Sequence, residues 1–329
     1  MSKTTLAPQS TETPDAKAQT EIQPQSCASD EFINAVKDGD LATAKALYAQ
    51  DREQATCTSE IVQLAAMSGR VELLEWTHSL TKDDCTKAFQ HRLMEKVCFK
   101  KGHLQVFQWL RDHAYRFCTP AIFRGAADSG SMETVLWICE HYPDVYELAK
   151  GIRMDNVACY DNLPMLKWLH ERDFFFGATA MDAAAQNGFL HIVQWLHENR
   201  TEGASTWALD SAATFGHLDM VLFLHFHRSE GGTTVAMDLA AENDHLDVLQ
   251  FLHHNRSEGC TTNAMDNAPT VAILNFLHEQ RNEGCTDEIV VKAVARAKVP
   301  VLEWLLANKR EMVDLKTVRE LAVQTSKDE

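Results

Sequence analysis

The chain has 329 residues, of which 45% are hydrophobic and 24% charged, and its 47 acidic residues against 31 basic ones give a net charge of -16. A charge of this sign repels phosphate groups, so we expect no nucleic-acid partner. We also expect no membrane segment, because no apolar run reaches the roughly 18 residues of a membrane helix. Because no signal-peptide pattern is visible, we expect the protein in the cytoplasm or the nucleus.

The chain begins with a polar segment and continues as an array of short units. Residues 1–30 are rich in Gln, Ser, Thr and Pro without an apolar run, which predicts a disordered tail. Residues 31–325 hold the array, and residues 326–329 form a second disordered end. In the first half of the array, the expected turns between helices are Gly39-Asp40-Leu41, Gly69-Arg70-Val71, Gly102-His103-Leu104 and Gly130-Ser131-Met132.

An aromatic residue returns at nearly constant spacing along the array. The series is Trp76, Trp109, Trp137, Trp168, Trp195, Phe223, Phe251, Phe276 and Trp304. A period of about 28 residues indicates stacked supersecondary units instead of one closed core. We expect each ring to lie buried between successive layers, so that Trp195→Ala costs about 3–5 kcal/mol.

The repeat is clearest from residue 179 to residue 286, where each unit predicts two short helices. Small residues such as Ala184 and Ala185 in the first helix allow another helix to approach closely. Gly188 and Gly216 mark the turn between the two helices. After the second helix we expect a left-handed residue to close it, at Gly203, Gly231, Gly259 and Gly284.

Four aspartates recur in the first turn of the first helices. They are Asp182, Asp210, Asp238 and Asp266. Negative charge is favoured at a helix N-terminus, so we interpret them as exposed charges that stabilise the helix dipole and promote solubility. A contact with a basic partner is the alternative.

Two stretches depart from the regular repeat. The unit at 263–287 has lost three residues, and Pro269 should stop its first helix early. Spacing also breaks down in the stretch 141–178, which contains Pro143 and the run Phe174-Phe175-Phe176. We interpret this second stretch as a repacked loop.

The pattern resembles the ankyrin repeat. Ala236-Met237-Asp238 occupies the family's P-L-H slot, Ala240-Ala241 the A-A slot, and Gly216 with His217-Leu218-Asp219 the start of the G-H-L-E-V-V segment. The intact T-P-L-H sequence is absent, and the period of about 28 is shorter than the family's 33. The resemblance, closest to short-repeat arrays of the oomycete type, implies an all-α, ankyrin-type solenoid of about ten helix-turn-helix repeats with reduced hairpins.

The resemblance also implies a concave surface that binds a partner protein. Here that surface maps to the residues after each A-A pair and to turn residues, namely Gln186, Asn187, Ser205, Thr214, Phe215, Glu230, Thr233, Glu242, Asn243, Glu258 and Thr261. Phe215 is the sharpest candidate, because an aromatic at an exposed helix end can anchor an interface. Partial burial of Phe215 against the following turn is the alternative.

Cysteine and histidine follow the repeat and do not form a metal-binding pattern. Cys57, Cys85, Cys118, Cys260 and Cys285 recur before threonine, and a C-x-x-C pair is absent. Equivalent positions one helix layer apart are about 10 Å from each other, too far for a disulfide or a shared zinc. We therefore expect structural thiols, no metal and no cofactor.

These observations predict a non-catalytic, monomeric scaffold whose partner protein has a basic or apolar surface. One alternative is a substrate adaptor for a ubiquitin ligase or a kinase, which would need a docking segment in the tail before residue 31. The other is an enzyme with a site in the irregular stretch 141–178. A pocket with converging polar groups in that stretch would favour the enzyme.

Overall fold

The computed structural model describes residues 28–53, 55, 57–81, 103–115, 118–314, 316 and 318–319. These residues form helices and no strand, so the described part of the chain is all-α, as predicted. Nearly all of the expected N-terminal tail and all of the C-terminal end lie outside the described residues. None of the helices found in this part is long and apolar enough to cross a membrane.

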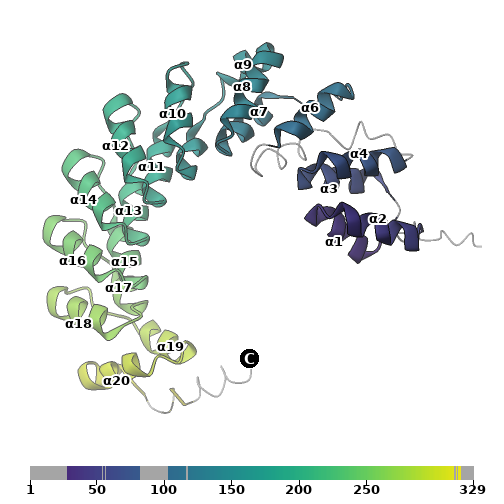
Figure 1. Ribbon diagram of the computed structural model, residues 1–329. Helices are drawn as coiled ribbons and strands as arrows, with labels where there is room; N and C mark the ends of the chain where they lie inside the picture. Colours follow the sequence, from purple (N-terminus) through teal and green to yellow (C-terminus); the bar gives the residue numbers. More distant parts are fainter. Residues whose placement is uncertain are drawn as a thin grey trace, which may run out of the picture. The chain divides into compact units, whose positions relative to one another are not determined.

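The chain divides into two compact units, residues 1–88 and 89–329. The first unit contains two helix pairs (Figure 1), which are α1 (Asp30–Asp38) with α2 (Leu41–Gln50) and α3 (Ser59–Ser68) with α4 (Val71–Leu80). The first helices α1 and α3 pack against each other, and each also packs against its own second helix. The edge of Tyr48 meets the ring of Trp76 at 5.6 Å between centroids.

The second unit continues the alternation of short helices. Its elements are α6 (Leu104–Asp112), α7 (Pro120–Asp128), α8 (Met132–His141), α9 (Pro143–Ala149), η1 (Asp155–Tyr160), α10 (Leu163–His170), α11 (Ala178–Gln186), α12 (Leu190–Asn199), α13 (Thr206–Thr214), α14 (Leu218–His227), α15 (Thr234–Glu242), α16 (Leu246–Asn255), α17 (Thr262–Asp266), α18 (Val271–Gln280), α19 (Glu288–Ala295), α20 (Val299–Asn308) and η2 (Arg310–Met312).

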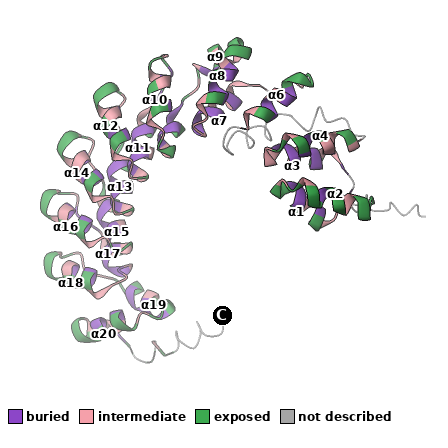
Figure 2. Cartoon of the chain, in the orientation of Figure 1, coloured by how far each residue is buried: buried purple, intermediate pink, exposed green. Residues whose placement is uncertain are grey.

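From α11 onward the helices form two layers (Figure 1). We call α11, α13, α15, α17 and α19 the first-helix layer, because neighbouring members contact one another in chain order. Their partners α12, α14, α16, α18 and α20 form the second-helix layer. Buried residues lie between the layers, and the second helices expose their outer sides (Figure 2). This arrangement buries Ala184 and Ala185 completely, as expected for helices that pack closely.

The turn between the first and the second helix uses a left-handed residue. At Gly188 the φ angle is +73°, the N–H of Gly188 donates to Ala185, and the N–H of Phe189 donates to Ala184. These two bonds satisfy carbonyls that the end of the helix leaves free. Gly216 repeats the arrangement, while Asp244 and Ala297 adopt the same positive φ without glycine's freedom.

The prediction for the glycines that follow the second helices is partly wrong. Gly203 is left-handed, with φ +77°, but α12 already ends at Asn199, followed by extended Arg200. Gly203 therefore shapes the loop instead of closing the helix. The same separation occurs at Gly231, Gly259 and Gly284.

The two irregular stretches are irregular in the structure. Helix α17 has five residues, against nine in α15, and ends three residues before Pro269, as predicted. The stretch 141–178 is helical, so its interpretation as a repacked loop is wrong. Helix α9 is an additional helix that packs on α7 and α8, and the 3₁₀ helix η1 takes the place of a first helix beside α10 and α11. Phe174 is buried and stacks on Phe123 at 5.4 Å, so it belongs to the core of this region.

The recurring aromatic rings are less buried than predicted. Trp109, Trp137 and Trp304 are buried, but Trp195 and the remaining members of the series are only half-buried. Each ring from Trp195 onward meets the edge of a histidine on the preceding second helix, as His170 does with Trp195 at 5.2 Å. Because Trp195 keeps part of its surface in water, we lower the expected cost of Trp195→Ala to about 2–3 kcal/mol.

Candidate functional site

A buried aspartate in each of the first helices α11, α13, α15 and α17 holds the start of the next first helix. The carboxylate of Asp182 accepts two hydrogen bonds from Ser205, at 2.8 Å from the backbone N–H and 2.7 Å from the hydroxyl. The arrangement recurs in three further pairs, Asp210 with Thr233, Asp238 with Thr261 and Asp266 with Thr286. The four aspartates are only 3–7% exposed. Their interpretation as first-turn charges that serve the helix dipole and solubility is therefore wrong. None of the four lies in the first turn of its helix, and each binds the next repeat.

A second polar contact links neighbouring second helices and loops. Arg228 pairs with Glu230 and donates to His197 Nδ1 of the preceding second helix at 3.1 Å. Glu230 in turn accepts the backbone N–H of Ala204 from the preceding loop at 3.1 Å. A guanidinium can only donate, so His197 accepts at Nδ1 and carries its proton at Nε2. We call this set the Arg–Glu–His contact.

The Arg–Glu–His contact recurs and controls the charge of its glutamates. Arg200 donates to His170 and Arg256 to His225, at 3.0 and 3.3 Å. Burial opposes ionisation of Glu230, but its hydrogen bonds from Arg228 and from backbone N–H groups hold its pKa at about 2. Hydrogen bonds from Arg256 likewise hold the pKa of Glu258 at about 2. These glutamates are therefore ionised partners of arginine at neutral pH.

Five of the predicted partner-binding residues take part in these contacts. Ser205, Thr233 and Thr261 cap the first helices and donate to the buried aspartates. Glu230 and Glu258 belong to Arg–Glu–His contacts, with about a quarter of each side chain exposed. Their polar groups bind the neighbouring repeat.

The other six predicted residues lie at the C-terminal ends of three adjacent first helices. Gln186 and Asn187 end α11, Thr214 and Phe215 end α13, and Glu242 and Asn243 end α15. Asn187, Phe215 and Asn243 are exposed, and the other three are half-buried. Phe215 is 51% exposed, with its ring stacked near His217 at 6.3 Å. The alternative of partial burial against the turn is therefore observed, half of the ring surface stays exposed, and the role of Phe215 as an interface anchor stays a prediction.

Trp207 is a candidate that the sequence analysis missed. It lies at the start of α13 and is 52% exposed. Of the seven tryptophans in the chain it is the one that does not belong to the periodic series, and this irregularity is the signal that could have found it. Val235 occupies the equivalent position of α15 and is 37% exposed.

Together these side chains form one face, which we call the α13–α15 face. It comprises Trp207, Ser211, Thr214, Phe215, Val235, Leu239, Glu242 and Asn243. The residues of each helix follow a spacing of three, four or eight, so they share one side of their helix. Helices α13 and α15 pack side by side, which joins the two sides into a continuous surface.

The surroundings of this face are strongly acidic. The stretch 177–286, which the structure describes completely, holds fourteen Asp and Glu against four Arg and no Lys, a net charge of -10. All four arginines are paired with glutamate. Six further carboxylates in this stretch form no ion pair and are at least partly exposed, namely Glu198, Asp219, Glu242, Asp244, Asp247 and Glu279.

The described cysteines are buried or half-buried thiols. Burial raises the pKa of Cys57 and Cys260 to about 11 and that of Cys118 to about 12. A thiol at these values is protonated at neutral pH and is a poor nucleophile. Cys85 lies outside the described residues. Among the residues that the structure does describe, no group of three or more His, Cys, Asp or Glu could hold a metal.

The irregular stretch 141–178 uses its best-placed polar groups for packing. Asp155 pairs with Arg153 and accepts the backbone N–H of Gly177 at 2.6 Å. Nearby Asp128 is 1% exposed and accepts no hydrogen bond within ordinary geometry. Burial raises its pKa to about 6, which the side chain of Asn156 and the charge of Arg124 oppose only in part. A carboxyl buried to this degree is out of reach of a substrate.

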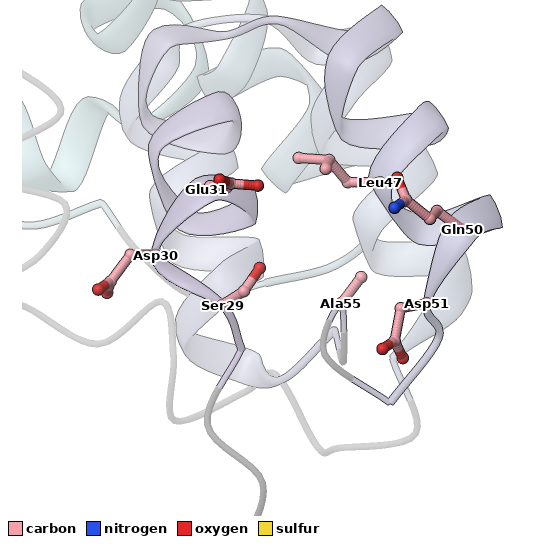
Figure 3. A pocket seen from close by; sticks show the side chains of 7 residues that line it. All are labelled: Ser29, Asp30, Glu31, Leu47, Gln50, Asp51 and Ala55. Atoms are coloured by element: carbon pink, nitrogen blue, oxygen red, sulfur yellow. The ribbon is translucent and has the colours of Figure 1, made fainter.

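The first unit contains an open cavity of about 520 Å³ between the start of α1 and the end of α2. Ser29, Asp30 and Glu31 line one side and Leu47, Gln50, Asp51 and Ala55 the other, with the carboxylate of Asp30 pointing away (Figure 3). Ser29 already caps α1 by accepting the N–H of Phe32, and Asp51 accepts the N–H of Glu53.

Comparisons with known proteins assign no family to the chain. No protein-family model matches the chain, and no curated protein matches it either.

Proposed function

We propose that the chain is a non-catalytic scaffold that binds a partner protein on the α13–α15 face. Half-exposed Trp207 and Phe215 on a single nine-residue helix carry this proposal. Large, solvent-exposed aromatic side chains on a rigid element are typical anchors of an interface. Polar groups at the repeating positions bind neighbouring repeats, whereas these two rings are irregular additions to the repeat.

The ankyrin-type arrangement is part of the same proposal. Support comes from first helices that pack in chain order, second helices that pack beside them, and left-handed glycines at the turns between them. In an ankyrin-type array the first-helix layer would line the concave side, where the α13–α15 face lies. The adaptor alternative depends on the tail before residue 31, most of which is outside the described residues.

Affinity capture with the full chain tests the proposed surface. Wild type, the double variant Trp207→Ser/Phe215→Ser and the control Phe226→Ser serve as baits, with captured proteins quantified by mass spectrometry. Phe226 is a matched control because it is 68% exposed on α14, in the second-helix layer. We expect at least one protein to bind wild type and Phe226→Ser and to fall about tenfold or more with the double variant.

Circular dichroism and thermal unfolding of all three baits verify that the fold is intact. Capture of the same proteins in the same amounts by all three baits would contradict the proposed surface.

A further inference from the structure

The histidines of the second unit differ in what their ring nitrogens contact. Nε2 of His217 lies 3.1 Å from the carbonyl of Gln186, and Nδ1 of His254 lies 2.6 Å from that of Gln250. Because a carbonyl only accepts, these two nitrogens carry protons, and both bonds survive when the ring becomes charged. Another group of histidines accepts from the guanidinium of an arginine instead, and its members are His170, His197 and His225.

An Arg–Glu–His contact exists only while its histidine is neutral. The three Nδ1 atoms lie 3.0, 3.1 and 3.3 Å from Nη1 of Arg200, Arg228 and Arg256. A proton on Nδ1 would remove the acceptor and place two positive charges at hydrogen-bond distance. Histidine changes its charge between pH 5 and pH 8, so mild acid is enough to reach these contacts.

The charged groups around these histidines do not offset the added proton. Facing His197 are Arg228 and Glu230 of the loop after α14, together with His227 of α14, whose ring centroid is 5.9 Å away. Glu230 is held by Arg228 and by the N–H of Ala204, and with a pKa of about 2 it stays ionised across this range. The ion pair therefore has no net charge and turns its positive end toward His197.

The same groups surround the other histidines at this position of the repeat. They are Arg200 with Glu202 at His170, Arg256 with Glu258 at His225, and Arg281 with Glu283 at His253. Burial lowers the pKa of His253, and His254 and Arg281 add to this shift. Glu283 opposes it only in part. A histidine with a lowered pKa stabilises the fold at neutral pH, and this contribution is lost as the pH falls.

We propose that the Arg–Glu–His contacts are acid-sensitive links between neighbouring second helices and loops, which open when His170, His197 and His225 take up protons. The first-helix layer stays joined, because its links between aspartate and Ser or Thr contain no histidine. Mild acid therefore loosens the side of the second helices and lets neighbouring repeats change their relative angle without unfolding. The proposed partner surface lies on the first-helix layer, so this inference does not depend on it.

NMR of the full chain with 15N-labelled histidine reports which ring nitrogen carries the proton. At pH 8 we expect the Nε2–H form for His170, His197 and His225. The opposite Nδ1–H form is expected for the internal control His254, which donates to a carbonyl. Single His→Asn variants assign the signals. The Nδ1–H form at the three arginine-bound positions would overturn the inference.

Urea unfolding at pH 8 and pH 5 measures the contribution of the links. In His170→Asn/His197→Asn/His225→Asn, the asparagine oxygen replaces Nδ1 as an acceptor and takes up no proton in this range. Since the folded state needs these histidines neutral, the unfolded chain binds more protons in acid. Between pH 8 and pH 5, we expect the unfolding equilibrium constant to rise about tenfold more in wild type than in the triple variant. The control His254→Asn should keep the wild-type dependence.

Hydrogen exchange of wild type locates the opening, after correction for the pH dependence of the intrinsic exchange rate. At pH 5 the N–H groups of Ala204 and Gly232, which donate to Glu230 and Glu258, should lose about tenfold protection relative to pH 8. Helices α13 and α15 should keep theirs.

Three results would contradict the acid-sensitive links. They are equal loss of protection in both layers, loops that stay protected at pH 5, and parallel unfolding profiles of wild type and the triple variant. The histidine tautomers and the exchange of wild type give an answer even where the triple variant does not fold.

Discussion

At the scale of single residues, the most informative groups are carboxylates that the sequence presents as equivalent. Four aspartates recur with the repeat, and their charge suggested that they are exposed. They are Asp182, Asp210, Asp238 and Asp266. The structure buries them because each meets a hydroxyl residue of the next repeat. A signal for this was present, since Asp182, Asp210 and Asp238 each precede their Ser or Thr partner by 23 residues. Period analysis compares equivalent positions, so it does not find contacts between different positions of adjacent units.

Asp128 gives a prediction for the pH dependence of stability. Burial raises its pKa in the folded state from 3.8 to about 6. The folded state therefore holds the proton more tightly, and its contribution to stability is complete below about pH 4 and is lost as the pH rises through about 6. We expect Asp128→Asn to remove this loss, worth about 2–3 kcal/mol between pH 4 and pH 7.

Urea unfolding of wild type and Asp128→Asn at pH 4 and pH 7 measures the effect. Asp144→Asn serves as the control, because Asp144 is exposed on α9. Parallel pH profiles for wild type and Asp128→Asn would show that burial of Asp128 has no energetic consequence.

At the scale of elements, the sequence predicted a helix end where a single residue determines that end. Pro269 stops α17 early because proline removes a backbone donor and clashes with the preceding turn. Helix α9 and the 3₁₀ helix η1 could not be predicted in the same way, since they depend on how Phe174 packs against Phe123 and Tyr146. The repeat pattern also did not predict that Gly203 lies in the loop, because the preceding helix ends without a glycine.

The turns between first and second helices allow a paired prediction. Gly216 has φ +72°, and a Cβ atom there would lie 2.5 Å from His245 Nδ1, so Gly216→Ala should destabilise the protein by about 1–2 kcal/mol or more. Ala297 holds the equivalent left-handed conformation with φ +50°, so Ala297→Gly should be neutral or stabilising by up to about 1 kcal/mol.

Thermal unfolding of the two single variants checks both signs. If both variants changed the stability in the same direction, the left-handed conformation would not be what determines the stability at these two positions.

At the scale of the whole molecule, the sequence predicted an array of helix pairs but not what links the repeats. The periodic aromatics predicted that a buried ring lies between each two successive layers. In the structure, half-buried rings share this role with the buried aspartates and with the Arg–Glu–His contacts. These polar links join only neighbouring repeats. The free energy of unfolding in the regular part of the second unit should therefore be a sum of contributions from single repeats and from contacts between neighbouring repeats.

Asp210→Asn tests that expectation. Loss of one charged acceptor should destabilise the protein by about 1–3 kcal/mol. Hydrogen exchange should then accelerate most in α13 and α15, which Asp210 joins through Thr233, and least in α20. Asp219→Asn is the exposed control on α14, and equal acceleration across every helix of the second unit would refute the local model.

The constant 23-residue offset between Asp182, Asp210 or Asp238 and its Ser or Thr partner has a consequence for how such a chain can change in length. A block running from one capping residue to the residue before the next, such as 205–232, contains the acceptor for the following block and the donors for the preceding one. Duplicating or deleting one such cassette leaves every buried aspartate with a hydroxyl residue opposite it. Chain growth by whole cassettes is therefore compatible with this fold, and the contact between Asp266 and Thr286, which are 20 residues apart, shows that a unit can also be three residues shorter and keep its contact.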